Sequence, residues 1–183
     1  MDALIVVDMQ VGLLDGAPKH DLQGVVDRIN ALAEKVRRKG GKVIWIRHCG
    51  KAGDGFERHT AGWEFLPDLM RREDDLVVEK TLNDPYVGTR LGETLALMQP
   101  RRVLVTGWAT DFCVDATVRS TVSHDHPVVA VSDGHTLNDR PHLSAAAVIA
   151  HHNWLWSGLI TNRSVRVATT GELLAERAPS SSR

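Results

Sequence analysis

Cysteine, charge of one sign and long hydrophobic runs are all scarce in this chain. Only two cysteines, Cys49 and Cys113, occur among its 183 residues. Two thiols in a chain of this size exclude a disulfide framework of the kind that stabilises small secreted domains. The first apolar run, residues 3–7, is too short for a secretion signal or a membrane span, and no basic segment precedes it. We therefore expect a reduced, cytoplasmic setting without a membrane partner.

The charges are nearly balanced. Lys and Arg number 22, Asp and Glu number 23, and the formal net charge is −1. No global basic field favours a nucleic acid or an anionic membrane as a partner, so neither is expected.

Length and composition are those of one soluble domain. Hydrophobic residues make up 43% of the chain and charged residues 25%, as is ordinary for globular proteins. We find no internal repeat or dividing linker, and we predict a single domain over residues 1–177. The Ser-rich end, residues 178–183, is predicted to be a disordered tail.

Short apolar runs alternate with amphipathic segments along the chain. We predict strands over 3–7, 42–46, 76–79, 102–106, 127–131 and 165–167, and helices over 22–39, 89–98, 113–123, 142–156 and 170–176. This alternation predicts a three-layer α/β/α domain with a mostly parallel, six-stranded, Rossmann-like sheet.

Reactive side chains follow the predicted strands. Asp8, His48, Lys80, Cys113 and Asp133 each lie at or just past the carboxyl end of a strand. Ligands of open α/β sheets bind at that edge, so we expect these side chains to gather there. Asp133 begins Asp-Gly, and turn chemistry explains that pair equally well.

Cys113 lies where a strand runs into a helix. Backbone N–H groups and the positive end of the helix dipole would stabilise its thiolate and a developing oxyanion. A small buried residue that fills the junction is the alternative, since free cysteine is often buried.

Asp8 and Lys80 would complete a site for acyl transfer. A carboxylate near a thiol can accept its proton and later deliver it to a leaving amine. An ammonium nearby favours the ionised forms of both groups.

Three segments of the chain resemble the isochorismatase-like cysteine hydrolases, a family that includes nicotinamidases and N-carbamoyl amidohydrolases. They are Leu4-Ile5-Val6-Val7-Asp8-Met9-Gln10, Val78-Glu79-Lys80-Thr81 and Val105-Thr106-Gly107-Trp108-Ala109-Thr110-Asp111-Phe112-Cys113-Val114. The resemblance implies a six-stranded α/β fold, a catalytic triad of Asp8, Lys80 and Cys113, and a homo-oligomer, either a dimer or a tetramer. It also implies a cis peptide at Trp108–Ala109 and an oxyanion hole made by the amides of Ala109 and Cys113.

The chain departs from the nicotinamidase pattern after its second strand. The Asp-x-His metal motif of those enzymes is absent, and the region reads Arg47-His48-Cys49-Gly50. One alternative would assemble His48, Asp54 and His59 around a metal, but their spacing is irregular. We expect no metal and no organic cofactor.

We predict that the substrate pocket draws on six side chains. They are Leu13, His48, Asp84, Tyr86, Trp108 and Phe112. If Asp84 faces the pocket, it favours an amine- or guanidine-bearing substrate. A turn aspartate before Pro85 is the alternative.

These features predict a hydrolase of an amide-type C–N bond in a small molecule, acting through a covalent thioester on Cys113. An ester, lactam or vinyl ether is an alternative substrate on the same fold. A non-catalytic nucleotide-binding or assembly subunit is the alternative of another class, although residues 8–16 contain neither Gly-x-Gly-x-x-Gly nor a phosphate loop.

Overall fold

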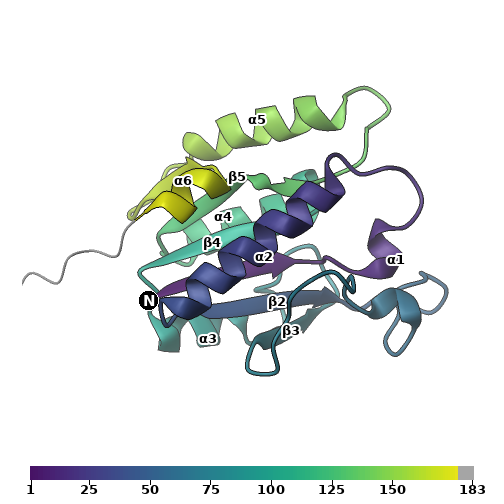
Figure 1. The fold of residues 1–183 in the computed structure, drawn as a ribbon, viewed down its shortest axis with the longest axis horizontal. Helices are drawn as coiled ribbons and strands as arrows, with labels where there is room; N and C mark the ends of the chain where they lie inside the picture. Colours follow the sequence, from purple (N-terminus) through teal and green to yellow (C-terminus); the bar gives the residue numbers. More distant parts are fainter. Residues whose placement is uncertain (177–183) are drawn as a thin grey trace, which may run out of the picture.

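Six parallel strands form one sheet in a computed structural model that describes residues 1–176. The strand order is β3-β2-β1-β4-β5-β6, and every neighbouring pair is parallel (Figure 1). The strands are β1 (Asp2–Val7), β2 (Lys42–His48), β3 (Leu76–Lys80), β4 (Arg102–Trp108), β5 (Val128–Thr136) and β6 (Val165–Ala168). The predicted six-stranded α/β fold is confirmed, and the sheet is parallel throughout.

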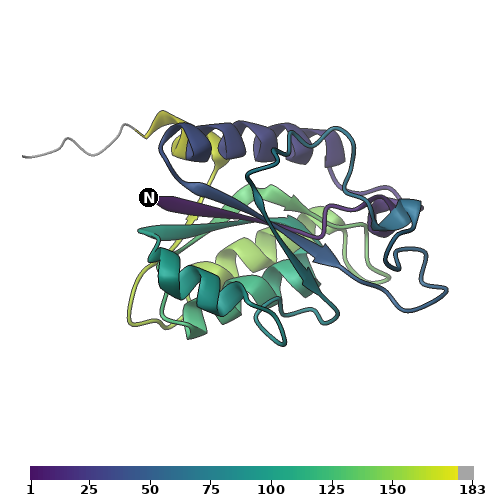
Figure 2. The same ribbon diagram turned by 90° about the horizontal axis from the view of Figure 1, so that it is seen from below.

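Helices cover both faces of the sheet (Figure 2). One face carries α2 (Leu22–Arg38) and α6 (Thr170–Ala175), and the other carries α3 (Leu91–Met98), α4 (Asp115–Ser123) and α5 (Ala145–Ser157). A short helix, α1 (Val11–Leu14), follows β1, and a 3-10 turn spans Ala61–Trp63. None of the helices within residues 1–176 has the length and apolar character needed to cross a bilayer.

Side chains of β1 point alternately to the two faces of the sheet, and each face has its own hydrophobic core. Leu4 and Val6 belong to the cluster under α2, whereas Ile5 and Val7 belong to the cluster under α3 and α4. Successive side chains of a strand point to opposite faces, and a strand covered on both faces needs apolar residues at every position.

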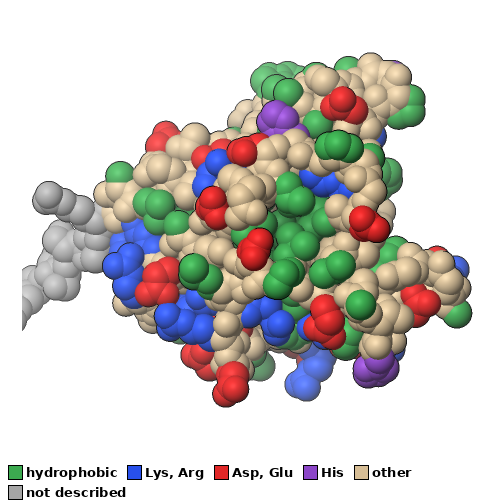
Figure 3. Space-filling model, turned by 45° about the vertical axis from the view of Figure 1, so that its right-hand side comes forward, with side chains coloured by type: hydrophobic (Ala, Val, Ile, Leu, Met, Phe, Trp, Pro, Cys, Tyr) green, Lys and Arg blue, Asp and Glu red, His purple; other side chains and the backbone are tan. Residues whose placement is uncertain are grey.

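The chain changes direction across the sheet between β1 and β4. From β1 it proceeds outward through β2 to β3, and it then returns to β4 on the opposite side of β1. Such a switch point leaves a crevice beyond the carboxyl ends of its two strands. That end of the molecule is hollowed between two projecting lobes, with hydrophobic side chains gathered in the hollow (Figure 3).

Three local features differ from the sequence prediction. β5 continues to Thr136, so residues 133–136 are strand and form no turn. The four-residue helix α1 was not predicted. The segment that carries Cys113 begins as a π-helical turn, Thr110–Val114, before α4 starts at Asp115. The predicted domain end at residue 177 and the tail at 178–183 lie outside the described residues.

Candidate active site

Asp8 and Lys80 meet at the carboxyl edge of the sheet. Asp8 is the first residue after β1 and Lys80 is the last residue of β3. The two side chains are fully enclosed, and Lys80 Nζ lies 2.7 Å from Asp8 Oδ2. Because burial removes water from both charges, each depends on the other for compensation.

The Lys80 ammonium also reaches the thiol. Lys80 Nζ lies 3.3 Å from Cys113 Sγ, 3.1 Å from His48 Nδ1 and 2.9 Å from the carbonyl oxygen of Leu82. The structure therefore brings together Asp8, Lys80 and Cys113, the three residues of the predicted triad.

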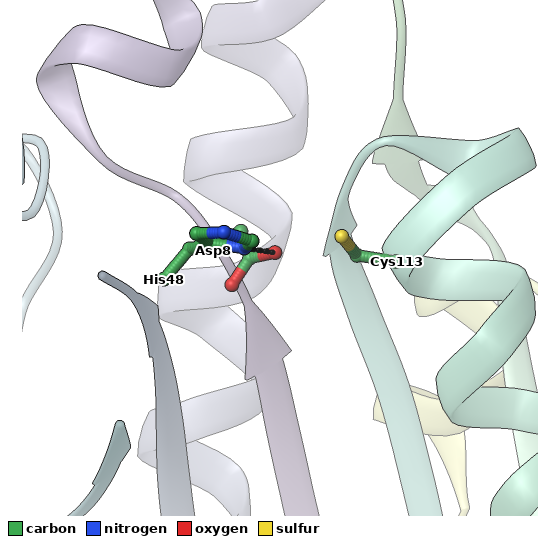
Figure 4. Close-up of side chains that lie close together, drawn as sticks. All are labelled: Asp8, His48 and Cys113. Carbon is green, nitrogen blue, oxygen red and sulfur yellow. Dashed lines mark ion pairs between the residues drawn. The ribbon is translucent and has the colours of Figure 1, made fainter. Parts of the chain in front are cut away.

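A metal does not fit this cluster. Ligand atoms of Asp8, His48 and Cys113 lie within 4.8 Å of one another (Figure 4). The Lys80 ammonium lies within hydrogen-bonding distance of one atom from each of them. Its positive charge therefore occupies the position that a metal ion would need. No other group of three or more His, Cys, Asp or Glu side chains gathers in this way within residues 1–176.

The alternative metal set is not assembled. The Asp54 carboxylate accepts a hydrogen bond from the Lys51 N–H, and the His59 ring packs against Trp63. His48 faces the triad instead.

Burial sets the protonation states of the site. It raises the pKa of the Asp8 carboxyl, against the opposing effect of the Lys80 charge. Burial and the neighbouring Asp8 carboxylate raise the pKa of the Cys113 thiol to about 12. Burial and the Lys80 charge lower the pKa of the His48 imidazole.

The expectation that the helix end and a nearby ammonium stabilise the Cys113 thiolate is therefore corrected, because the pKa of the thiol is raised. Near neutral pH Cys113 is a neutral thiol, because its enclosure and the Asp8 charge outweigh the Lys80 charge. Its proton must leave as the sulfur attacks.

The turn before Cys113 begins with a cis peptide. The Trp108–Ala109 bond is cis, as the family resemblance implies. The N–H groups of Phe112 and Val114 both donate to the Ala109 carbonyl oxygen. Ala109 is fully buried at the start of the turn. The oxyanion role of the Ala109 and Cys113 amides stays a prediction.

The cysteine turn has two polar anchors. Thr110 Oγ1 lies 2.9 Å from His135 Nδ1, and the Asp111 carboxylate accepts two hydrogen bonds from the Arg140 guanidinium, at 2.7 and 2.8 Å. Such bidentate pairs fix geometry as well as charge.

Close packing with β1 requires glycine at position 107. A Cβ on Gly107 would lie 2.2 Å from the Val7 carbonyl oxygen, and its φ of +120° is one that other residues rarely adopt. Gly107 thus allows the strand that leads to the thiol to lie directly beside the strand that leads to Asp8.

Two predicted pocket residues, Tyr86 and Asp84, make hydrogen bonds within the protein, and their contact with a substrate stays a prediction. Tyr86 is buried in the core, and its hydroxyl donates to Thr121 Oγ1 at 2.9 Å. Asp84 accepts hydrogen bonds from the Tyr86 N–H and from the Ser120 hydroxyl. These bonds hold the Asp84 carboxylate against its own turn and α4, which favours the turn interpretation over a pocket carboxylate.

The other pocket candidates are placed differently. Trp108 packs between two hydrophobic clusters, which favours a scaffold role. Leu13 is half-buried in α1, and Phe112 is 53% exposed with the Arg140 guanidinium above its ring. Substrate contact by Leu13, Phe112 and His48 stays a prediction.

Sequence reasoning missed two residues that touch the site. Asn83 Oδ1 lies 3.6 Å from Cys113 Sγ, within reach of the thiol proton. The Gln10 side chain hydrogen-bonds the backbone of His48. Both residues lie close in sequence to a predicted triad residue, since Asn83 follows Lys80 by three residues and Gln10 follows Asp8 by two. This proximity could have indicated that they lie near the site.

Fold and site together define an α/β protein with an acid, an ammonium and a thiol at the switch point of a parallel sheet. The isochorismatase domain model matches residues 2–154. The chain belongs to the isochorismatase family.

Several relatives share sequence or structure with this chain. A streptothricin hydrolase of Streptomyces noursei is 32% identical over 142 residues, which cover 77% of this chain and 51% of that protein. The ureidoacrylate amidohydrolase RutB of Klebsiella pneumoniae is 26% identical over 64% of this chain and 65% of its own length. A cysteine hydrolase structure from Pseudomonas syringae superposes with a TM-score of 0.82, at 26% identity, over 94% of this chain and 90% of that one. The chain thus spans about half the length of the streptothricin hydrolases that it matches.

Proposed function

We propose that this protein is a cysteine-dependent hydrolase that cleaves an amide-type C–N bond in a small molecule through a covalent thioester. One observation carries the proposal: Lys80 Nζ lies 2.7 Å from Asp8 Oδ2 and 3.3 Å from Cys113 Sγ. Relatives named for amide hydrolysis and a structural relative named as a cysteine hydrolase support it.

Acylation begins at the neutral thiol. Cys113 Sγ attacks the substrate carbonyl carbon as its proton moves to the Asp8 carboxylate. The raised pKa of Asp8 favours that transfer. The carbonyl oxygen becomes an oxyanion, for which the Ala109 and Cys113 amides are the proposed donors. Asp8 then returns the proton to the leaving nitrogen, the C–N bond breaks, and the acyl group remains on sulfur.

Deacylation reverses the roles. Asp8 takes a proton from water as the water oxygen attacks the thioester carbon. The C–S bond then breaks, Asp8 returns that proton to the sulfur, and the acid departs. The Lys80 ammonium offsets the negative charge that passes between Asp8 and sulfur.

A screen for ammonia or amine release from a library of small amides tests the proposal. Cys113→Ala serves as the blank, and mass spectrometry of a Lys80→Met enzyme with its best substrate looks for an acyl group on Cys113. Cys113-dependent release supports the proposal, and equal release by Cys113→Ala overturns it.

We also propose that the protein assembles as a homodimer or homotetramer in a reduced cytoplasmic setting. Trp154 in α5 is 71% exposed, and Ile160, three residues past the end of that helix, is 97% exposed. Exposed apolar groups of this size favour an interface. Light scattering at micromolar concentration tests the assembly, and a monomer would contradict it.

A further inference from the structure

The contacts of Lys80 determine where the proton of the His48 imidazole lies. An ammonium group has three hydrogens and no acceptor. Lys80 Nζ faces His48 Nδ1 at 3.1 Å, and a hydrogen on Nδ1 would point at the hydrogens of Lys80. Lys80 Nζ has four close neighbours for its three hydrogens, and whichever three it serves, an N–H on Nδ1 would face the ammonium. Nδ1 is therefore the nitrogen without a hydrogen, and the hydrogen of the neutral ring is on Nε2.

The charges around the ring are mixed. Lys80 and burial favour the neutral imidazole, whereas Asp8 and Asp54 favour the imidazolium. Asp8 Oδ2 is 4.0 Å from Nδ1, farther than Lys80, and Lys80 already neutralises it at 2.7 Å. The Cys113 thiol adds no charge at rest. The balance lowers the pKa of His48, and the ring stays neutral.

The backbone of His48 is held by a side chain from the neighbouring strand end. Gln10 is fully buried, and its Oε1 accepts the His48 N–H at 2.6 Å. Its Nε2 donates to the His48 carbonyl oxygen at 2.9 Å and to the Trp63 carbonyl oxygen at 3.0 Å. Gln10 thus pairs with both backbone polar groups of His48, as a strand would, at the point where β2 ends.

The second ring nitrogen of His48 is free to act. Nε2 makes no hydrogen bond within residues 1–176, and it is not among the buried polar atoms of that part of the chain that lack a partner. The His48 side chain is 18% exposed, beside the enclosed pair of Lys80 and Asp8. The His48 ring packs against the Phe56 ring in a T-shaped arrangement, which limits its rotation.

We infer that His48 is a specificity residue that presents a fixed Nε2–H donor to the substrate, with Gln10 as the residue that positions it. The substrate then carries a hydrogen-bond acceptor, a carbonyl oxygen, carboxylate or ring nitrogen, close to the scissile amide. The substrate part of this inference rests on the proposed function, whereas the tautomer and the role of Gln10 do not.

Nitrogen NMR of the wild-type protein tests the tautomer without any activity measurement. With ¹⁵N-labelled histidine at pH 7, we expect a bare nitrogen shift for His48 Nδ1 and a protonated-nitrogen shift for Nε2. An imidazolium, or a hydrogen on Nδ1, overturns the inference.

Variants of Gln10 test its positioning role. Gln10→Glu keeps an acceptor for the His48 N–H but places oxygen against two carbonyl oxygens, so we expect the His48 signals to shift or broaden. Gln23→Glu, on the exposed side of α2, is the matched control and should leave them unchanged. Unchanged His48 signals in a folded Gln10→Glu protein contradict the role of Gln10.

Binding to Cys113→Ala protein tests the donor. Succinamide carries a second carbonyl acceptor, and pentanamide is a chain of similar length without one. We expect succinamide to shift the His48 Nε2 signal and to bind about tenfold more weakly to a His48→Leu, Cys113→Ala protein, as loss of one hydrogen bond predicts. His48→Gln, which retains an N–H near the Nε2 position, should restore most of that affinity.

Equal effects of the two amides, or no shift of Nε2 by succinamide, overturn the donor assignment. Ammonia release that survives Cys113→Ala would overturn the proposed function and leave the tautomer and Gln10 results standing, so the two failures are distinguishable.

Discussion

Lys80 and Asp8 form an ion pair with 2.7 Å between Nζ and Oδ2, and neither side chain is exposed to solvent. A buried pair of this kind contributes little net stability compared with apolar residues, but removal of one partner leaves the other charge uncompensated. The pair therefore couples the chemistry of the site to the stability of the fold.

Asp8→Asn should lower both activity and stability. Loss of the proton acceptor should reduce kcat/KM at least about a hundredfold, since general base catalysis contributes at least that factor. The buried Lys80 charge would lower the free energy of unfolding by about 3–5 kcal/mol, as measured by urea titration.

Asp75→Asn is the matched control, because Asp75 pairs with Arg37 at 2.5 Å and both side chains are buried away from the site. It should lower stability by a similar amount and leave kcat/KM within about twofold for the folded protein. A comparable loss of activity in Asp75→Asn would mean that activity follows stability and that Asp8 has no chemical role.

Alkylation of Cys113 by iodoacetamide should show no thiolate plateau near neutral pH. Burial and the Asp8 charge raise the pKa of the thiol to about 12, and only the thiolate reacts. In a Cys49→Ser background, which leaves one thiol, the rate should rise about tenfold per pH unit from pH 7 to pH 10. A plateau below pH 8 would show a thiolate at rest and contradict this assignment.

His135 should make the protein less stable as the pH falls from about 6.5 to about 4. Burial lowers the pKa of His135 to about 4, whereas the unfolded residue titrates near 6.5. Between these values only the unfolded state binds the proton, so unfolding becomes easier by roughly 3 kcal/mol over the interval.

Urea unfolding at several pH values, compared between wild type and His135→Gln, measures this contribution. The variant should lose that part of the pH dependence, and it should also lower kcat because Thr110 loses its anchor. The same slope in both proteins would rule out His135 as the titrating group.

Asp84→Asn should leave substrate charge preference unchanged. Its two oxygens accept hydrogen bonds from the Tyr86 N–H and the Ser120 hydroxyl. These bonds hold the carboxylate against its own turn and α4, so we expect it to make no contact with the substrate. The measurement is the ratio of kcat/KM for cationic and neutral amides of equal length. A ratio that falls severalfold in Asp84→Asn would show that Asp84 contacts the substrate in the pocket.

The sequence predicted the positions of the triad residues in the fold better than it predicted the side chains of the substrate pocket. Apolar runs at regular spacing placed Asp8, Lys80 and Cys113 at strand ends, and a parallel sheet brings such ends to one edge. The predicted fifth strand ended too early, because residues 132–135 have the composition of a turn. In the structure Gly134 packs closely against Thr106, a contact with a distant strand that local sequence does not reveal.

The sequence pattern could not predict the direction in which individual side chains point. Tyr86 points into the core because Thr121 offers a partner for its hydroxyl there. The thiol pKa depended on the enclosure of Cys113 and on its distance from Asp8, and the helix position alone suggested the opposite shift. Both are tertiary properties.

The pairing of β1 with β4 has a consequence for folding kinetics. Thr106 Oγ1 donates to the Ile5 carbonyl oxygen across 101 positions of sequence, and Gly107 lies against Val7 in the same pair of strands. Contacts this distant form slowly, because a long loop must close before they are made. Asp8 follows one of these strands and Cys113 the other. During refolding, activity should therefore return together with the slow closure of the central strand pair and lag behind the helical signal.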